Sequence, residues 1–96
     1  MTVLSGAEVD ERLKALTGWS REGDEIRKQY KFRNFVEAMA FVNRVAQAAE
    51  AADHHPDITI NYNRVRMALT THSEGGLTDK DLGMAPKIDA SRSGDA

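Results

Sequence analysis

The sequence contains no cysteine, only two prolines and no long uninterrupted apolar run. Without cysteine, a disulfide scaffold, a thiol nucleophile and a thiolate metal site are all excluded. The most apolar stretch, residues 35–52, is interrupted by Glu37, Arg44 and Glu50 among other polar residues, so it is not a membrane span. Residues 1–6 show neither the basic nor the apolar region of a secretory signal. We therefore expect a cytoplasmic protein that does not enter membranes.

Neither sign of charge dominates the chain, which has 13 basic and 15 acidic residues and a formal net charge of −2. Nucleic-acid-binding domains usually carry a strong basic excess, so nucleic acid is not an expected partner. The 96 residues are 41% hydrophobic, which suits a packed core over residues 1–89 and a flexible tail of small and polar residues at 90–96. A domain this small buries only about 60–65% of its unfolded surface, which favours association into a homo-dimer or homo-tetramer.

Three helix starts carry the same capping pattern, in which Ser, Asn or Thr precedes an acidic residue by three positions. They are Ser5-Gly6-Ala7-Glu8, Asn34-Phe35-Val36-Glu37 and Thr78-Asp79-Lys80-Asp81. The second begins a long helix with two apolar stripes, one starting at Phe35 and one at Phe41, a pattern that predicts burial on more than one side. The third begins a short helix, which Gly83 weakens and which Pro86 is expected to kink or end.

Alternating apolar residues between these helices predict four strands. Residues 19–32 predict a hairpin that turns at residues 22–25. A second hairpin with a turn near Asn63 is predicted by two runs, the first with Ile58, Ile60 and Tyr62 and the second with Val65, Met67 and Leu69. Two hairpins can join into one four-stranded antiparallel sheet. The expected fold is therefore α+β, a two-layer sandwich with helices on one face of the sheet.

The three histidines of the chain, His54, His55 and His72, all lie where a predicted element ends. His54 and His55 close the long helix ahead of Pro56, and proline disfavours helical geometry at the residue before it. His72 follows the second predicted hairpin. Taken singly, each histidine has a simple structural explanation as a solvated or capping residue, because protonated histidine is favoured near a helix C-terminus.

Two carboxylates near these histidines also have simple structural explanations. Glu50 lies four residues before His54, so it is positioned to pair with His54 across one helical turn. Asp81 is the last residue of the third capping pattern and is explained by capping alone.

Taken together, these residues form a more specific pattern. The run Glu50-Ala51-Ala52-Asp53-His54-His55-Pro56, the later Leu69-Thr70-Thr71-His72 and Asp81 resemble the pterin-4a-carbinolamine dehydratases, also known as dimerisation cofactors of a homeodomain transcription factor. The resemblance extends from about Leu4 to Asp89 and implies the same α+β sandwich. It also implies a dehydratase (hydro-lyase) reaction that removes water from 4a-hydroxytetrahydropterin and yields quinonoid dihydropterin. The product is recycled to the tetrahydrobiopterin-type cofactor of aromatic amino acid hydroxylases, and the resemblance implies no metal and no organic cofactor.

The resemblance further implies an active site. His54, His55 and His72 match the catalytic histidines of the family and Asp81 matches their acidic partner, while Glu50, His55, Pro56 and Thr71 match positions that bind the substrate. Dehydration needs a general acid to protonate the departing hydroxyl and a base to take a proton from the ring nitrogen, and histidine can do either near neutral pH. We expect His54 and His72 to be the acid–base pair and His55 to hold the substrate hydroxyl. Asp81 is expected to orient a histidine or to bind the pterin.

Two alternatives belong to other classes of protein. Some members of the family are dimerisation partners of transcription factors and some bacterial relatives are assembly chaperones, so the chain can instead be a non-catalytic binding protein. Three histidines and a carboxylate could also bind a zinc ion. The side chains of the adjacent His54 and His55 would then have to converge on one ion, which is an awkward geometry for neighbouring residues. The presence of all three histidines together with Asp81 favours catalysis.

Overall fold

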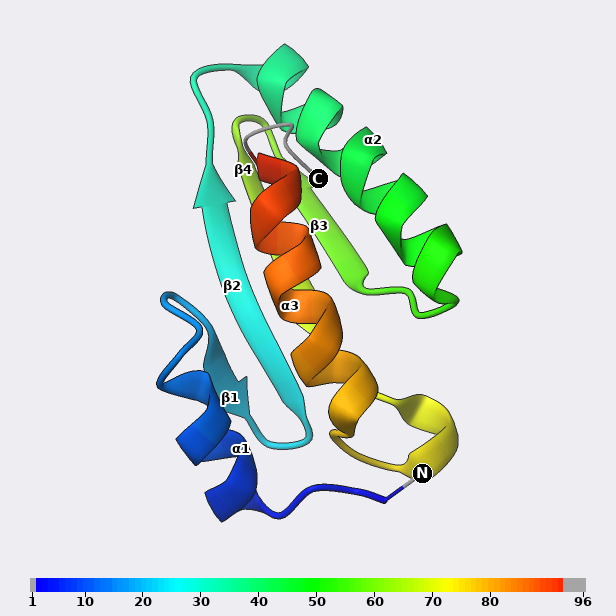
Figure 1. Cartoon of the computed structure of the whole chain (residues 1–96). Coiled ribbons are helices and arrows are strands. Elements are labelled where there is room, and N and C mark those ends of the chain that lie inside the picture. The colour runs from blue at the N-terminus through cyan, green and yellow to red at the C-terminus, as the bar shows by residue number, and fades with distance from the viewer. Residues whose placement is uncertain (1, 93–96) are drawn as a thin grey trace.

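The computed structural model describes residues 2–92 (Figure 1). In chain order the elements are α1 (Gly6–Leu13), β1 (Ser20–Glu22), β2 (Glu25–Lys31), α2 (Phe35–Ala52), β3 (Asp57–Asn61), β4 (Arg64–Leu69), the 3₁₀ turn η1 (His72–Glu74) and α3 (Asp79–Arg92). The four strands form one antiparallel sheet in the order β1-β2-β4-β3. The helices cover one face of this sheet (Figure 1), which confirms the predicted α+β two-layer sandwich.

Both predicted hairpins form, and each has a two-residue turn. The first turns through Gly23 and Asp24, with Gly23 at φ +61°, a conformation that glycine adopts without strain. The second turns through Tyr62 and Asn63. Tyr62, which the apolar alternation places in a strand, instead lies in this turn with φ +53°. The strand β3 therefore ends one residue earlier than the pattern predicts.

All three predicted helix starts are capped by their own side chains. Ser5 Oγ accepts a hydrogen bond from the Glu8 N–H at 3.1 Å, and the Glu8 carboxylate accepts one from the Ser5 N–H at 3.2 Å. At α2, Asn34 Oδ1 accepts from the N–H three residues later at 2.9 Å. At α3, the Asp81 carboxylate accepts from the Thr78 N–H at 3.0 Å. These contacts are local, which is why the sequence pattern predicts where each helix begins.

Helix α3 is longer than the sequence predicts, because Pro86 lies inside it and does not end it. Pro86 and Gly83 are both exposed. The opposite side of the helix buries Leu82, Met84, Ala85 and Ile88 in the core. An interior proline costs about 3 kcal/mol, whereas burial of each large apolar side chain contributes roughly 1.5–3 kcal/mol. Packing therefore outweighs the local cost of the proline.

The C-terminal end of α3 is anchored by an arginine of α2. Arg44 donates from Nε to the Ser91 carbonyl at 2.6 Å and from its guanidinium to the Arg92 carbonyl at 3.1 Å. The Ser91 side chain is fully buried. The predicted flexible tail is therefore wrong for residues 90–92, which belong to the helix, and the rest of that tail, residues 93–96, lies outside the described residues.

The core lies between the helices and the sheet. Its buried apolar residues are Val9, Trp19, Ile26, Tyr30, Ala38, Phe41, Val45, Ala49, Val65, Met67, Leu69, Leu77, Leu82, Met84, Ala85 and Ile88. Helix α2 packs its Phe41 stripe into this core, but Phe35 and Val36 remain 48% and 76% exposed. The start of this helix therefore exposes apolar side chains in the single chain. No helix within residues 2–92 has the length and apolarity needed to cross a membrane.

Candidate active site

Helix α2 ends just before Asp53, a residue with left-handed backbone, and the two histidines that follow it point in different directions. Asp53 has φ +52° and ψ +41°, and the His54 N–H bonds back to the Ala49 carbonyl at 3.1 Å. This is the hydrogen-bond pattern of a Schellman ending, a position that glycine usually takes and that Asp tolerates. The reversal at Asp53 turns the His54 side chain inward, where it is 11% exposed, and leaves the His55 side chain 54% exposed.

His55 pairs with Glu50 at the surface through its Nε2 atom. Both side chains are well solvated, so this pair contributes little to stability. The prediction that Glu50 pairs with His54 is wrong, because the turn at Asp53 moves His54 off the helix surface and brings His55 beside Glu50. Pro56 follows, half-buried, at the entry to β3.

His54 instead bonds to a carboxylate that is shielded from solvent. His54 Nε2 lies 2.6 Å from Asp81 Oδ1, and Asp81 is 0% exposed. The other oxygen, Asp81 Oδ2, accepts from the Thr78 N–H at 3.0 Å and from Thr71 Oγ1 at 2.8 Å. One carboxylate therefore caps α3 with one oxygen and holds a histidine with the other, so the capping explanation of Asp81 and its contact with a histidine are both correct.

The hydrogen bonds around Asp81 determine which nitrogen of His54 carries a proton. An ionised carboxylate only accepts hydrogen bonds, so His54 Nε2 must donate. In the neutral ring, Nδ1 then has no proton and can accept one. Among the described residues, no hydrogen bond engages this Nδ1 atom. His54 is thus oriented as a base in the way that a buried aspartate orients the histidine of a catalytic triad.

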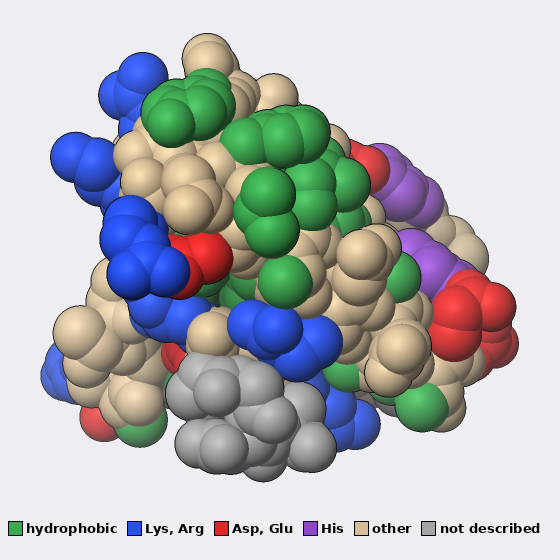
Figure 2. Space-filling view, turned by 90° about the horizontal axis from the view of Figure 1, so that it is seen from above, with side chains coloured by type: hydrophobic (Ala, Val, Ile, Leu, Met, Phe, Trp, Pro, Cys, Tyr) green, Lys and Arg blue, Asp and Glu red, His purple; other side chains and the backbone are tan. Residues whose placement is uncertain are grey.

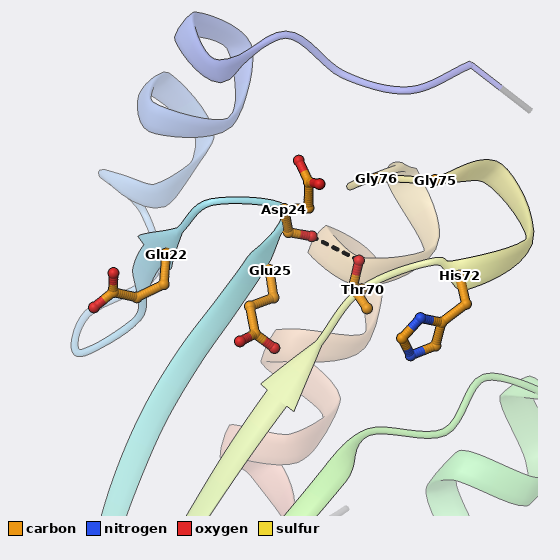
Figure 3. Close-up of a pocket in the computed structure, with 7 residues that line it drawn as sticks. All are labelled: Glu22, Asp24, Glu25, Thr70, His72, Gly75 and Gly76. Carbon is orange, nitrogen blue, oxygen red and sulfur yellow. Dashed lines mark hydrogen bonds between the residues drawn. The ribbon is translucent and has the colours of Figure 1, made fainter.

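His72 stands at the start of η1, in a short loop closed by backbone pairing of Thr71 with Gly76. It is exposed and lines a hollow of about 360 Å³ together with Thr70, Gly75, Gly76, Glu22, Asp24 and Glu25 (Figure 3). Thr70 Oγ1 donates to the Asp24 carbonyl at 2.6 Å. This bond ties the β1–β2 turn to the end of β4, so the acidic residues of that turn line the same hollow as His72.

The histidine side chains lie along one edge of the molecule. Figure 2 shows them next to acidic side chains and away from most of the lysines and arginines seen in that view. Within residues 2–92, no hydrogen bond joins one imidazole to another, and His54 lines a separate hollow of about 240 Å³. Thr71 links the two regions, because it bonds to Asp81 and directly precedes His72. The structure therefore brings His54 and Thr71 into contact with the two oxygens of Asp81, whereas His55 and His72 lie outside this network.

The zinc alternative requires at least three ligating side chains around one ion. In the described part of the chain, no group of three or more His, Asp or Glu side chains is arranged to hold a metal ion.

Sequence patterns do not reveal two parts of this site. Thr78 belongs to a capping pattern and to the stretch that resembles the family, but neither signal indicates that its Oγ1 lies 2.9 Å from Thr71 Oγ1. The acidic wall beside His72 comes from the β1–β2 turn, which is far from His72 along the chain. The pairing of β2 with β4 brings the two segments together, and no local pattern signals that proximity.

The sequence matches a known family along nearly all of its length. The family model described as Pterin 4 alpha carbinolamine dehydratase matches residues 2–91. A protein of Thermomicrobium roseum is 53% identical over 88 residues, which cover 92% of this chain and 95% of that protein. A protein of Roseiflexus sp. strain RS-1 is 56% identical over 88 residues with the same coverage of both chains. Both carry the name "Putative pterin-4-alpha-carbinolamine dehydratase".

Solved structures with the same fold include two informative cases. A crystal structure from Brucella melitensis, described as a transcriptional coactivator/pterin dehydratase, is 40% identical with a TM-score of 0.90 and covers 95% of this chain and 99% of that chain. A pterin dehydratase-like protein, identified as a RuBisCO assembly factor in the alpha-carboxysome, is 20% identical with a TM-score of 0.63 and covers 77% of this chain and 86% of that chain. The second likeness concerns the fold alone.

Proposed function

Because this chain belongs to the pterin-4a-carbinolamine dehydratase family, we propose that it removes water from 4a-hydroxytetrahydropterin and yields quinonoid dihydropterin. The observation that carries this proposal is the hydrogen bond between His54 and the buried Asp81 carboxylate. It supplies an oriented base, and the same carboxylate also bonds to Thr71, the residue directly before His72.

In this reaction the bond between C4a and its hydroxyl breaks, the ring nitrogen bonded to C4a loses its proton, and a carbon–nitrogen double bond forms. We assign His54 Nδ1 as the base that takes this proton, because Nε2 already donates to Asp81. The Asp81 carboxylate stabilises the imidazolium that results. We assign His72 as the acid that protonates the departing hydroxyl, which leaves as water.

The remaining site residues divide between substrate contact and support. We propose that the exposed His55–Glu50 pair holds the substrate hydroxyl and that Pro56 shapes the chain beside it. The sequence predicts that Thr71 binds the substrate. Because Thr71 is 4% exposed and its hydroxyl bonds to Asp81, we assign it instead to the support of Asp81.

The proposed reaction changes no oxidation state and moves only protons and water, so acid–base side chains are sufficient and no cofactor is required. We propose that it takes place in the cytoplasm. There it would return the product to the tetrahydrobiopterin-type cofactor pool of an aromatic amino acid hydroxylase.

The test is the rate of 4a-hydroxytetrahydropterin dehydration by wild type, His54→Ala and His72→Ala, with circular dichroism to verify folding. General acid–base catalysis contributes about 10²–10⁴-fold, so both variants should lose activity in that range. His55→Ala is the comparison of the same residue type, and removal of one solvated hydrogen bond should cost about tenfold or less. A folded wild type without any acceleration would contradict the proposed function.

A second candidate function is protein association, which the exposed start of α2 favours. Phe35 and Val36 are 48% and 76% exposed, and Figure 2 shows hydrophobic side chains gathered on the face in view, bordered by lysines and arginines. Contiguous exposed apolar surface marks interaction sites. We propose that this side of α2 joins copies of the chain in a homo-dimer or homo-tetramer.

Light scattering of wild type, Val36→Asp and Val3→Asp tests this association. Val3 is also exposed, at 43%, but lies outside α2, so only Val36→Asp should lower the mass. A folded wild type that is both monomeric and inactive would favour a binding protein for a different partner.

A further inference from the structure

The hydrogen bonds around Asp81 continue into two threonine hydroxyls. Thr71 Oγ1 and Thr78 Oγ1 lie 2.9 Å apart, and Thr78 Oγ1 also accepts from the Lys80 N–H at 3.2 Å. Thr78 and Asp81 are fully buried and Thr71 is nearly so. Throughout residues 2–92, every buried side-chain nitrogen or oxygen has a hydrogen-bond partner. The network is therefore complete without any further group.

The single proton on each hydroxyl determines the direction of this chain of hydrogen bonds. Thr71 Oγ1 lies 2.8 Å from Asp81 Oδ2, a carboxylate oxygen with no proton, so Thr71 must donate. Because its only proton is then used, Thr71 can only accept from Thr78. Donation thus runs from the Lys80 N–H to Thr78, from Thr78 to Thr71 and from Thr71 to Asp81.

We propose that Thr71 and Thr78 are positioning residues for His54, an inference that rests on the dehydratase function proposed above. The Thr71 hydroxyl and the Thr78 N–H both donate to Oδ2, so Oδ1 is the oxygen left to accept from His54. Rotation of the carboxylate out of its present plane would break both of those bonds. The threonines therefore hold the carboxylate in the orientation in which Oδ1 accepts from His54 Nε2, which leaves the basic nitrogen, Nδ1, available to the substrate.

Thr71→Val tests the proposal, because valine keeps the shape of threonine and lacks the hydroxyl. Loss of one charge-assisted hydrogen bond should lower kcat by about 10- to 100-fold with little change in KM, and Thr71→Ser should restore kcat to within about threefold. Ser91→Ala is the matched control, because it removes another buried hydroxyl, which bonds to the Lys87 carbonyl at 2.9 Å at the far end of α3. Its kcat should stay within about threefold of wild type.

A second readout does not depend on activity. Nitrogen NMR shifts of the His54 ring report which nitrogen carries the proton. The wild type should show the Nε2–H form, and Thr71→Val, in which the carboxylate is held less firmly, should show a smaller share of it. An inactive wild type whose share of the Nε2–H form falls in Thr71→Val would refute the dehydratase function and still support the positioning role. The positioning role is overturned by an Nδ1–H form in the wild type or by a folded Thr71→Val variant with unchanged kcat. Equal losses in Ser91→Ala and Thr71→Val would overturn it as well. If Thr71→Val does not fold, Thr71→Ala, which also lacks the hydroxyl, takes its place in both measurements.

Discussion

Asp81→Asn should remove most of the activity and leave the fold intact. Asp81 Oδ2 accepts from Thr71 and Thr78, and the amide oxygen of asparagine is the only atom of the new side chain that can replace it. The amide NH₂ group then faces His54 Nε2. Because NH₂ only donates, Nε2 must accept and the ring proton moves to Nδ1. His54 can then no longer take a proton from the substrate at Nδ1.

The expected loss of kcat is about 10³–10⁴-fold. The same substitution in a Ser-His-Asp triad, where it leaves the geometry intact but imposes the wrong tautomer, costs about 10⁴-fold. The lower figure allows for the acid catalysis that His72 would retain. The free energy of unfolding should fall by only about 1–2 kcal/mol, the difference between charged and neutral acceptors for the hydrogen bonds that remain.

The assay compares kcat at saturating pterin, chemical denaturation and the His54 tautomer in wild type and Asp81→Asn. Asp10→Asn is the matched control, since it makes the same chemical change in α1, where Asp10 pairs with Arg21 at 2.9 Å. We expect wild-type activity from this control. The reasoning fails if a folded Asp81→Asn variant keeps more than about a tenth of the wild-type kcat.

Three further perturbations probe other features. Asp53→Val should lower the free energy of unfolding by about 1–2 kcal/mol, because a β-branched side chain disfavours left-handed backbone. Asp53→Gly should not lower it, and equal denaturation curves for the two variants would contradict this explanation. Burial and the hydrogen bond to Asp89 raise the pKa of Tyr30, so its contribution to stability is present below about pH 10 and is lost as the pH rises further. Tyr30→Phe should accordingly show a shallower alkaline fall in unfolding free energy, and an unchanged slope would argue against this. Pterins with a phosphorylated side chain should show a several-fold higher KM than neutral ones at low salt, because Glu22 and Asp24 line the hollow beside His72. Added salt should reduce this difference, and a salt-independent KM ratio would count against the electrostatic explanation.

Most of the fold could be predicted because its signals are short. Gly23 marks a two-residue turn, and the Ser5–Glu8 box marks a helix start through contacts three residues apart. The length of α3 could not be predicted in this way. The helix-breaking tendency of Pro86 is a local property, whereas the burial of Leu82 and Ile88 that overrides it depends on where the helix packs.

The candidate site was predicted as a set of residues but not as a set of contacts. The resemblance indicated His54, His55, His72 and Asp81, and their catalytic roles stay predictions. Glu50 pairs with His55 and not with His54, because the chain reverses at Asp53. Asp is only one of several residues that can adopt this backbone, so the reversal is weakly encoded in sequence.

Short-range patterns in the sequence are enough to predict the order of helices and strands, the α+β class and the residue types available for acid–base chemistry. These properties depend on capping, alternation and turn preferences, which act between residues a few positions apart. The tertiary structure is needed to show that Asp81 bonds to His54 and that two threonines donate to its other oxygen. It alone also placed an acidic turn beside His72. The reason is that a buried polar atom takes its partner from whatever packing brings within about 3 Å, and the packing of α3 against the end of β4 is a property of the whole fold.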